Sequence, residues 1–205
     1  MTILELQGAQ VQDYLDQLAG LRPSIFREYP YLYDGQLDEE RRYLSGYAGK
    51  GQVLLALDAG RVVGAITGMP LAEESEPFVE PFRVAGLEPE QFYYIGELLL
   101  LPAYRNLGWG SRLLARLEQL VAQQGRYASC CLATVARPSN HPLQPVGFVP
   151  IERFCQRHGY ALISGVAAQV SWQELDGQIS PKKLDFWRKA CSAPIQERTR
   201  RDGQP

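Results

Sequence analysis

This sequence is short of the residues on which several common kinds of enzyme depend. It has only two histidines, His141 and His158, and neither lies near a serine pattern that would complete a hydrolase triad. Two scattered histidines also offer too few ligands for a metal centre, so we expect no metal. The four cysteines lack metal-ligand spacing, and adjacent Cys130 and Cys131 would point to opposite faces of a strand. We expect them to be free thiols in a reducing cytoplasm.

The chain also lacks a charge excess and a long apolar run. Its 21 basic and 23 acidic residues give a net charge of −2, which argues against nucleic acid or an acidic membrane surface as the main partner. It has no apolar stretch long enough to predict a membrane span, and residues 1–20 are typical of a strand and a helix rather than a signal peptide. These features predict a cytoplasmic protein with no nucleic-acid and no membrane partner.

Lysine is missing from the most distinctive part of the chain, residues 98–114, LLLLPAYRNLGWGSRLL. No lysine occurs between Lys50 and Lys182, so the phosphate-loop pattern G-x-x-x-x-G-K-[ST] is absent. The dinucleotide pattern G-x-G-x-x-G fails as well, because Leu113 stands where its third glycine would be. A nucleotide-binding α/β protein of either kind is therefore disfavoured.

What the chain does contain is the pattern of a mixed α/β domain. Strands are predicted over 2–6, 52–57, 61–67, 92–101, 127–135, 160–163 and 166–172. Helices are predicted over 10–21, 37–47, 108–124, 150–159 and 181–191, with loops over 70–91 and 137–147 and a disordered last dozen residues. The strand 92–101, the helix after it and the strand 127–135 should form a parallel, right-handed crossover.

The turn before helix 108–124 has the features of an anion site. A helix N-terminus carries unpaired N–H groups and a partial positive charge, yet residues 103–117 contain no acid and several arginines. Gly108 and Gly110 would let a phosphate approach the backbone closely. The alternative interpretation is a tight turn that needs glycine for steric reasons alone.

The pattern Arg105-x-x-Gly108-x-Gly110 lies between a strand ending in E-L-L-L-L-P and an amphipathic helix. In that setting it resembles the acyl-CoA-binding motif of the GNAT superfamily of acyl-CoA N-acyltransferases. The order of elements resembles the family from residue 2 to about 173, and Gly159-Tyr160 matches its step after a short helix. The stretch FREYPYLYDGQLDEERRYLSGYA also resembles an uncharacterised bacterial subgroup.

The resemblance implies an α/β GNAT fold, in which helices flank a mixed, mostly antiparallel central sheet with one parallel strand pair around the CoA helix. It implies an acyltransferase domain over residues 1–175, with a C-terminal helix and a disordered tail over 176–205. The implied activity is transfer of an acetyl group from acetyl-CoA, as co-substrate, to a primary amine of a small molecule or peptide. The alternative is an acyl-CoA-binding sensor or interaction module without turnover, and either form could be a homodimer.

In the family, the central strand and the glycine loop hold CoA through their backbones. Carried over to this sequence, the implied CoA-binding residues are Leu99, Leu100, Leu101, Arg105, Asn106, Leu107, Gly108, Trp109, Gly110 and Ser111.

Glu97 is the candidate general base. It is the only ionisable carboxylate in the apolar stretch YYIGELLLLP, and burying a carboxylate without a partner is costly. Family members often place a catalytic glutamate on this strand, where an apolar surround makes a carboxylate hold a proton more readily. The alternative is a structural ion pair with an arginine such as Arg83 or Arg137.

The general acid and the acceptor residues are less clearly marked. In many family members a tyrosine four residues before the Gly-Phe/Tyr step protonates the CoA thiolate. In this sequence that position, four residues before Gly159, is Cys155. Cys155 is therefore a candidate acid, with Tyr160 or water as alternatives and a packing role as the commoner use of a buried cysteine. The candidate acceptor residues are aromatic or cationic, and a place in the core is an equally good interpretation for the aromatic ones. They are Phe26, Tyr29, Tyr31, Tyr33 and Arg137.

Overall fold

The computed structural model describes residues 1–6 and 8–191 of the 205-residue chain. Its strands are β1 (Thr2–Leu6), β2 (Gln52–Asp58), β3 (Arg61–Pro70), β4 (Phe92–Leu100), β5 (Ser129–Val135), β6 (Ala161–Gln173) and β7 (Ile179–Ala190). Its α-helices are α1 (Leu15–Phe26), α2 (Leu37–Ser45), α3 (Glu76–Val84), α4 (Trp109–Gln124) and α5 (Glu152–Arg157). Short 3-10 turns are η1 (Gly8–Tyr14), η2 (Gly46–Gly49), η3 (Leu71–Glu73), η4 (Pro89–Gln91) and η5 (Pro102–Tyr104).

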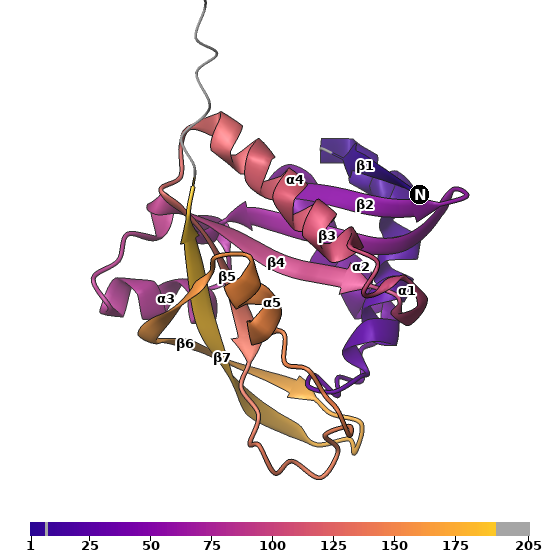
Figure 1. Cartoon of the computed structure of the whole chain (residues 1–205), viewed down its shortest axis with the longest axis vertical. Helices are drawn as coiled ribbons and strands as arrows, with labels where there is room; N and C mark the ends of the chain where they lie inside the picture. Colours follow the sequence, from indigo (N-terminus) through magenta and orange to yellow (C-terminus); the bar gives the residue numbers. More distant parts are fainter. Residues whose placement is uncertain (7, 192–205) are drawn as a thin grey trace, which may run out of the picture.

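The strands form one seven-stranded sheet in the order β1-β2-β3-β4-β5-β7-β6. Only β4 and β5 pair in parallel, and α4 makes the crossover between them. Every other neighbouring pair in this sheet is antiparallel. Figure 1 shows α4 lying across the near face of the sheet, with α1 and α2 on the far side. The predicted fold class, a mostly antiparallel sheet with one parallel pair around this helix, is confirmed.

Helices cover both faces of the sheet because the strands are apolar on both sides. On one face, Leu113 and Leu117 of α4 pack with Tyr93 and Ile95 of β4. The opposite face is covered by α1 and α2, whose buried leucines pack with Leu99. Further along that sheet, Phe82 of α3 packs among aromatic side chains of β4 and β7. The central strand β4 is therefore covered on both sides.

A β-bulge at Gly96 decides which way the end of β4 points. Ile95 and Glu97 pair with consecutive residues of β3, so Gly96 is one extra residue in β4. The extra residue shifts the alternation of side chains. Tyr93 and Ile95 face α4, whereas Glu97 and Leu99 face α1 and α2. The bulge thus places a carboxylate beneath the α1–α2 layer.

The segment 70–91, which the sequence predicts as a loop, contains the helix α3. Its four prolines conceal the pattern, but Pro77 lies in the first turn, where proline is tolerated. Val79 and Phe82, three residues apart, form the buried face of this helix. Burial of that apolar face outweighs the missing N–H of Pro81 within the helix.

The helix predicted over 181–191 is wrong, because this segment forms most of β7, between β5 and β6 in the sheet. Leu184 and Phe186 alternate on the buried face, and pairing with β5 runs from Val135–Leu184 to Ser129–Ala190. The sheet therefore extends well past residue 175. The predicted disordered tail lies outside the described residues.

The remaining predicted elements hold to within a few residues, apart from one shift and one merger. The helix predicted over 10–21 begins and ends later in the chain, as α1, because residues 8–14 form the 3-10 turn η1. The strands predicted over 160–163 and 166–172 are a single strand, β6, whose register shifts between Leu162 and Ala167. Gly165, at φ +79°, lies in this irregular stretch. The hairpin signal Asp58-Ala-Gly60 is confirmed, since Ala59 and Gly60 both have positive φ between β2 and β3.

Candidate active site

The loop before α4 leaves backbone N–H groups free to meet an anion. Asn106 and Gly108 have left-handed φ of 60° and 81°, a conformation that turns successive N–H groups into one concavity. The first helical bond runs from the Arg112 N–H to the Gly108 carbonyl at 3.1 Å. The N–H groups of residues 109–111 come before that bond, and no side chain caps the helix. No acidic residue occurs in the first turn, so the positive end of α4 is uncompensated there.

Gly110 of α4 faces Leu100 of β4 and Phe154 of α5. A Cβ atom built on it would lie 3.5 Å from Leu100 and 3.7 Å from Phe154, which is ordinary contact. Gly108 differs: a Cβ there would meet nothing within 4 Å, but its positive φ favours glycine. The two glycines therefore serve different needs, and only Gly108 requires glycine for its backbone conformation.

The end of β4 exposes a strand edge beside this loop. The β4–β5 ladder stops at Ile95 paired with Leu132, so the rest of β4 has no partner on that side. The Leu101 N–H donates to the Val63 carbonyl on the β3 side at 2.9 Å. By antiparallel alternation, the N–H and C=O of Leu100 point the other way, to the open edge. Of the three predicted CoA-binding residues Leu99, Leu100 and Leu101, only Leu100 therefore directs its backbone N–H and C=O toward the open edge, where a ligand can bind them.

Arg105 occupies part of that edge. Its Nε donates to the Leu100 carbonyl at 2.9 Å, and its Nη1 lies 2.6 Å from the Glu28 carboxylate just after α1. Both side chains are partly exposed, at 36% and 42%. Arg105 thus belongs to the segment 105–110 that leads into α4, called the anion loop below, and links it to the open edge of β4 and to the loop after α1.

Ser111, in the first turn of α4, is tied to the end of α5. Its Oγ lies 3.0 Å from Nε2 of His158. Burial lowers the pKa of His158 below its usual value, so this imidazole is neutral at pH 7. The contact fixes α5 against the start of α4, the two helices that border the open edge of β4.

Glu97 lies in a buried network of ionic groups. Its carboxylate pairs with the guanidinium of Arg22 in α1, which also pairs with Glu40 in α2. The Glu97 and Glu40 side chains are 3% and 1% exposed. Two carboxylates therefore share one arginine, and the network carries a net negative charge when both are ionised. The predicted alternative, an arginine partner, is present, but the arginine is Arg22.

The two arginines first considered for Glu97 pair elsewhere. Arg83 pairs with Glu76 and Glu80 on α3. Arg137 pairs with Glu174 and donates to the carbonyls of Pro30 and Tyr31. Its side chain is 9% exposed, so Arg137 anchors the loop after α1.

Two oxygens near the bulge have no hydrogen-bond partner among the described residues. They are Oε2 of Glu97 and Oγ1 of Thr67, which sits opposite Glu97 on β3. A buried acceptor without a donor costs free energy, and such groups occur where a ligand or an ordered water donates. Glu97 thus has one oxygen bound to Arg22 and one able to accept a proton.

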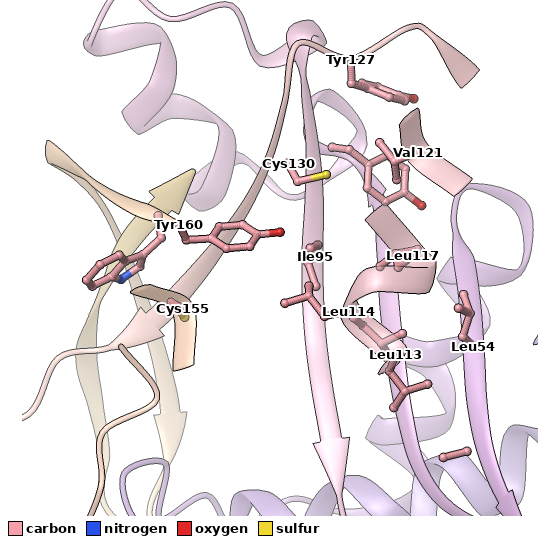
Figure 2. Close-up of a cluster of buried hydrophobic side chains, with 14 of the residues drawn as sticks. Leu54, Ile95, Leu113, Leu114, Leu117, Val121, Tyr127, Cys130, Cys155 and Tyr160 are labelled. Carbon is pink, nitrogen blue, oxygen red and sulfur yellow. The ribbon is translucent and has the colours of Figure 1, made fainter. Parts of the chain in front are cut away.

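Cys155 is enclosed in the core between α5, β5 and β7. It is 1% exposed and packs in the same cluster as Cys130, Tyr160 and Trp187, as Figure 2 shows for the residues it labels. Burial raises the pKa of its thiol to about 12. An ordinary thiol titrates at about 8.5, so Cys155 would not give its proton readily to a CoA thiolate. Packing is the role that its environment favours.

Cys155→Ala should therefore lower stability without lowering turnover per folded molecule. Removing a buried sulfur should cost about 1 to 2 kcal/mol of unfolding free energy, from lost burial and an unfilled space. Urea denaturation and steady-state turnover measured on one preparation check both parts. A fall in kcat of about 10²-fold with unchanged acetyl-CoA affinity would instead identify Cys155 as the acid.

Tyr160, the alternative acid, is also occupied. It is 3% exposed, and its hydroxyl donates to Glu118 at 2.8 Å. Burial is the main cause that raises its pKa well above the usual value. Because Cys155 and Tyr160 are both buried with raised pKa values, water is the remaining candidate to protonate the CoA thiolate.

The candidate acceptor aromatics separate into two groups. The rings of Phe26 and Tyr31 contact each other at a tilt, with centroids 4.5 Å apart, and both pack against the core clusters. Burial, together with the nearby Glu40 carboxylate, raises the pKa of Tyr33 well above its usual value, so Tyr33 adjoins the buried ionic network. Tyr29 lines a cavity, where its ring packs edge-on against Phe148 with ring centroids 4.7 Å apart.

That cavity, of about 600 Å³, opens beside the anion loop. Its wall is formed by Arg105, the loop after α1, the loop before α5 and the β6–β7 turn. Its lining residues are Glu28, Tyr29, Leu32, Arg105, Leu143, Pro145, Phe148, Val149 and Leu175. The structure thus brings Tyr29 and Arg105 together in this cavity, whereas neither candidate catalytic side chain, Glu97 or Cys155, lines it.

Sequence reasoning missed the cavity residues Glu28 and Phe148 as site residues and Glu40 as a partner of Arg22. The sequence carries a partial signal for Glu28, since it lies inside the aromatic stretch 26–33. Glu40 lies in a charged helix, and no local feature distinguishes it from its exposed neighbours Asp38 and Glu39.

Two kinds of feature are absent from the part of the chain that the structure describes. No group of three or more His, Cys, Asp or Glu side chains there is placed to hold a metal ion. None of the helices in residues 1–6 and 8–191 is both long and apolar enough to cross a membrane.

Comparison with known proteins gives a family match and several structural neighbours. Residues 18–161 match the model of the acetyltransferase (GNAT) family. A search of curated proteins found no match. An aminoglycoside 6'-N-acetyltransferase complexed with coenzyme A is 17% identical, with a TM-score of 0.61 over 96% of this chain and 100% of the other.

Two further structures share the fold at similar distance. The ribosomal-protein-alanine N-acetyltransferase from Brucella melitensis is 15% identical, with a TM-score of 0.60 over 93% of this chain and 99% of that one. The loading GNATL domain of CurA from Lyngbya majuscula is 17% identical, with a TM-score of 0.60 over 93% and 98% of the two chains. At these identities the likeness concerns the fold.

Proposed function

This chain belongs to the acetyltransferase (GNAT) family, and we propose that it transfers an acetyl group from acetyl-CoA to a primary amine of a small molecule or peptide. The observation that carries the proposal is the uncapped start of α4 beside the open edge of β4. The first suits a pyrophosphate, and the second suits an extended arm with amide groups. A structural neighbour is complexed with coenzyme A, which supports acetyl-CoA as the co-substrate.

The reaction needs a proton to leave the amine and a proton to reach the thiolate. The amine nitrogen attacks the thioester carbonyl carbon, the C–S bond breaks, and the CoA thiolate takes up a proton. Glu97 is our candidate for the first transfer. Its carboxylate pairs with Arg22 through one oxygen, and the other, Oε2, has no hydrogen-bond partner among the described residues. Because the side chain is 3% exposed, a water chain or an opening of α1 and α2 must connect it to the amine.

A second candidate function is supported by that same burial. A member of the fold that binds acyl-CoA without turnover would have the anion loop and no accessible base. The Arg22–Glu97 pair, closed beneath α1 and α2, is the observation in its favour. Turnover with any amine distinguishes the two functions.

Gly110→Asp should abolish acetyl-CoA binding without unfolding the protein. Gly110 is buried, so the new carboxylate should cost some stability. Its Cβ makes only ordinary contacts, however, and a negative charge in the first turn of a helix is favoured. The same charge should repel a pyrophosphate at this place. Acetyl-CoA at about 100 times its dissociation constant should stabilise the wild type by about 2.7 kcal/mol, and a thermal-shift assay should show no rise for the variant.

Ala115→Asp supplies the matched control, because Ala115 is exposed on α4 beyond its first turn. It should keep the wild-type thermal shift. An equal shift in Gly110→Asp would show that acetyl-CoA does not bind at this loop. Equal stabilisation by ATP and by acetyl-CoA would show that the loop recognises phosphate without the pantetheine arm.

A further inference from the structure

The walls of the cavity beside the anion loop are more apolar than polar. Its lining combines one carboxylate, one guanidinium and one phenol with the apolar side chains of Leu32, Leu143, Pro145, Phe148, Val149 and Leu175. A volume of about 600 Å³ is within the range of small-molecule sites. Such a cavity binds most of a ligand by burying its apolar surface and orients it with a few polar groups.

Its rim is apolar as well. Leu143 is 57% exposed, Val149 61% and Leu175 39%. These three side chains come from the loop before α5 and from the turn between β6 and β7, two segments that meet at the cavity. Exposed apolar side chains gathered at the mouth of a cavity indicate that the ligand's body is apolar where it enters.

The charges in the cavity limit what the ligand can carry. Glu28 is the only acid in the lining, and its carboxylate is paired with Arg105. A ligand with several ammonium groups would need several carboxylates, since each charge removed from water without a partner is penalised. It would also meet the positive charge of Arg105. A single ammonium group needs only Glu28.

We propose that the acceptor bound in this cavity is an amine with one positive charge on an apolar body, and that Glu28 binds its ammonium group. The inference rests on the proposed function for the identity of the reaction, but the binding itself can be measured without turnover. It separates this chain from a polycation-acetylating enzyme, although an aminoglycoside 6'-N-acetyltransferase is among its structural neighbours.

Arg105 links this acceptor site to CoA. Its guanidinium binds Glu28 and the Leu100 carbonyl, and it belongs to the loop proposed to hold the pyrophosphate. A bound phosphate competes with Glu28 for this guanidinium. Once Arg105 turns to the phosphate, the carboxylate of Glu28 is left for an ammonium group. CoA should therefore strengthen amine binding, and the amine should strengthen CoA binding by the same factor.

The test is calorimetric titration of 2-phenylethylamine, 2-phenylethanol and kanamycin into the full chain, alone and saturated with CoA, which carries no acetyl group to transfer. With CoA present, 2-phenylethylamine should bind at least about 10-fold more tightly than kanamycin, which carries several amines, and than the uncharged alcohol. Without CoA, its binding should be weaker. Glu28→Gln should weaken amine binding about 10-fold and leave alcohol binding unchanged.

Two variants complete the design. Leu143→Asp should weaken both phenyl compounds, because it places a charge on the apolar rim. Glu90→Gln, an exposed residue of η4 at the opposite end of β4, should bind all three compounds as the wild type does. Kanamycin binding as tightly as 2-phenylethylamine, or an unchanged affinity in Glu28→Gln, would overturn the proposal.

Acetyl transfer is measured separately, with acetyl-CoA and the same amines. Tight, Glu28-dependent binding of 2-phenylethylamine without acetylation would leave this inference standing and contradict the proposed function. Acetylation with a preference for kanamycin would support the proposed function and contradict this inference.

Discussion

Glu97→Gln should lower kcat/KM for acetyl transfer by about 10²- to 10³-fold, the range expected when a general base is removed. Glutamine keeps the shape and hydrogen-bonding capacity of the side chain but cannot take a proton from the amine. Acetyl-CoA binding should be unchanged, because the anion loop and the Leu100 edge are separate from this carboxylate. Steady-state kinetics with acetyl-CoA and a primary amine give the ratio, and thermal shift gives the binding.

The pH dependence should show the same effect. A general base must be unprotonated to act, so acidification should slow the wild type. This acid limb should be missing in Glu97→Gln. A variant with near-normal rate and an unchanged limb would assign Glu97 a structural role.

Glu40→Gln is the matched control for this experiment. Glu40 shares Arg22 with Glu97 and is equally buried, but it lies on α2 and not on the bulged end of β4. Either glutamine variant leaves Arg22 one carboxylate partner, so each should fold. Glu40→Gln should keep most of the rate, and a rate loss as large as that of Glu97→Gln would show that the network acts only through its stability.

Arg22→Met should cost about 3 to 5 kcal/mol of unfolding free energy, the loss expected when one partner of a buried ion pair is removed. The Glu97 and Glu40 carboxylates would remain together, buried and without a cation. Their desolvation and mutual repulsion are the physical cause. Urea denaturation monitored by tryptophan fluorescence measures the loss.

Adding Glu97→Gln and Glu40→Gln to Arg22→Met separates charge from packing. Arg22 also lies over the rings of Phe26 and Tyr43, contacts that a methionine partly retains. If the unpaired carboxylates cause the loss, the triple variant should recover much of it. A triple variant as unstable as Arg22→Met would show that the stacking of the guanidinium is what stabilises the fold.

Local pattern was sufficient to predict the centre of this fold and its anion loop. Strand β4, the turn with Gly108 and the apolar face of α4 follow one another in the chain, and each is specified by neighbouring residues. The bulge at Gly96 was not predicted, because it depends on how β4 pairs with β3. The roles predicted for these residues in CoA binding and catalysis stay predictions until the variants are measured.

Features that depend on tertiary packing could not be predicted in the same way. β7 has charged residues between its apolar ones and is a strand because β5 and β6 flank it in the sheet. The partner of Glu97 is Arg22, which is far from it in sequence and comes near only when α1 packs on the bulged end of β4. The apolar cavity is assembled from several separate segments, so its lining has no contiguous sequence signature.

Acetyl transfer itself tests the central claim most directly. The full chain is incubated with acetyl-CoA and 2-phenylethylamine, and both the released CoA thiol and the mass of the amine are followed. The account predicts thiol release in step with a product heavier by one acetyl group, and loss of both signals in Gly110→Asp. Acetyl-CoA that binds to the wild type with no thiol release and no acetylated product, for this amine and for a panel of other primary amines, would contradict it and identify an acyl-CoA-binding module.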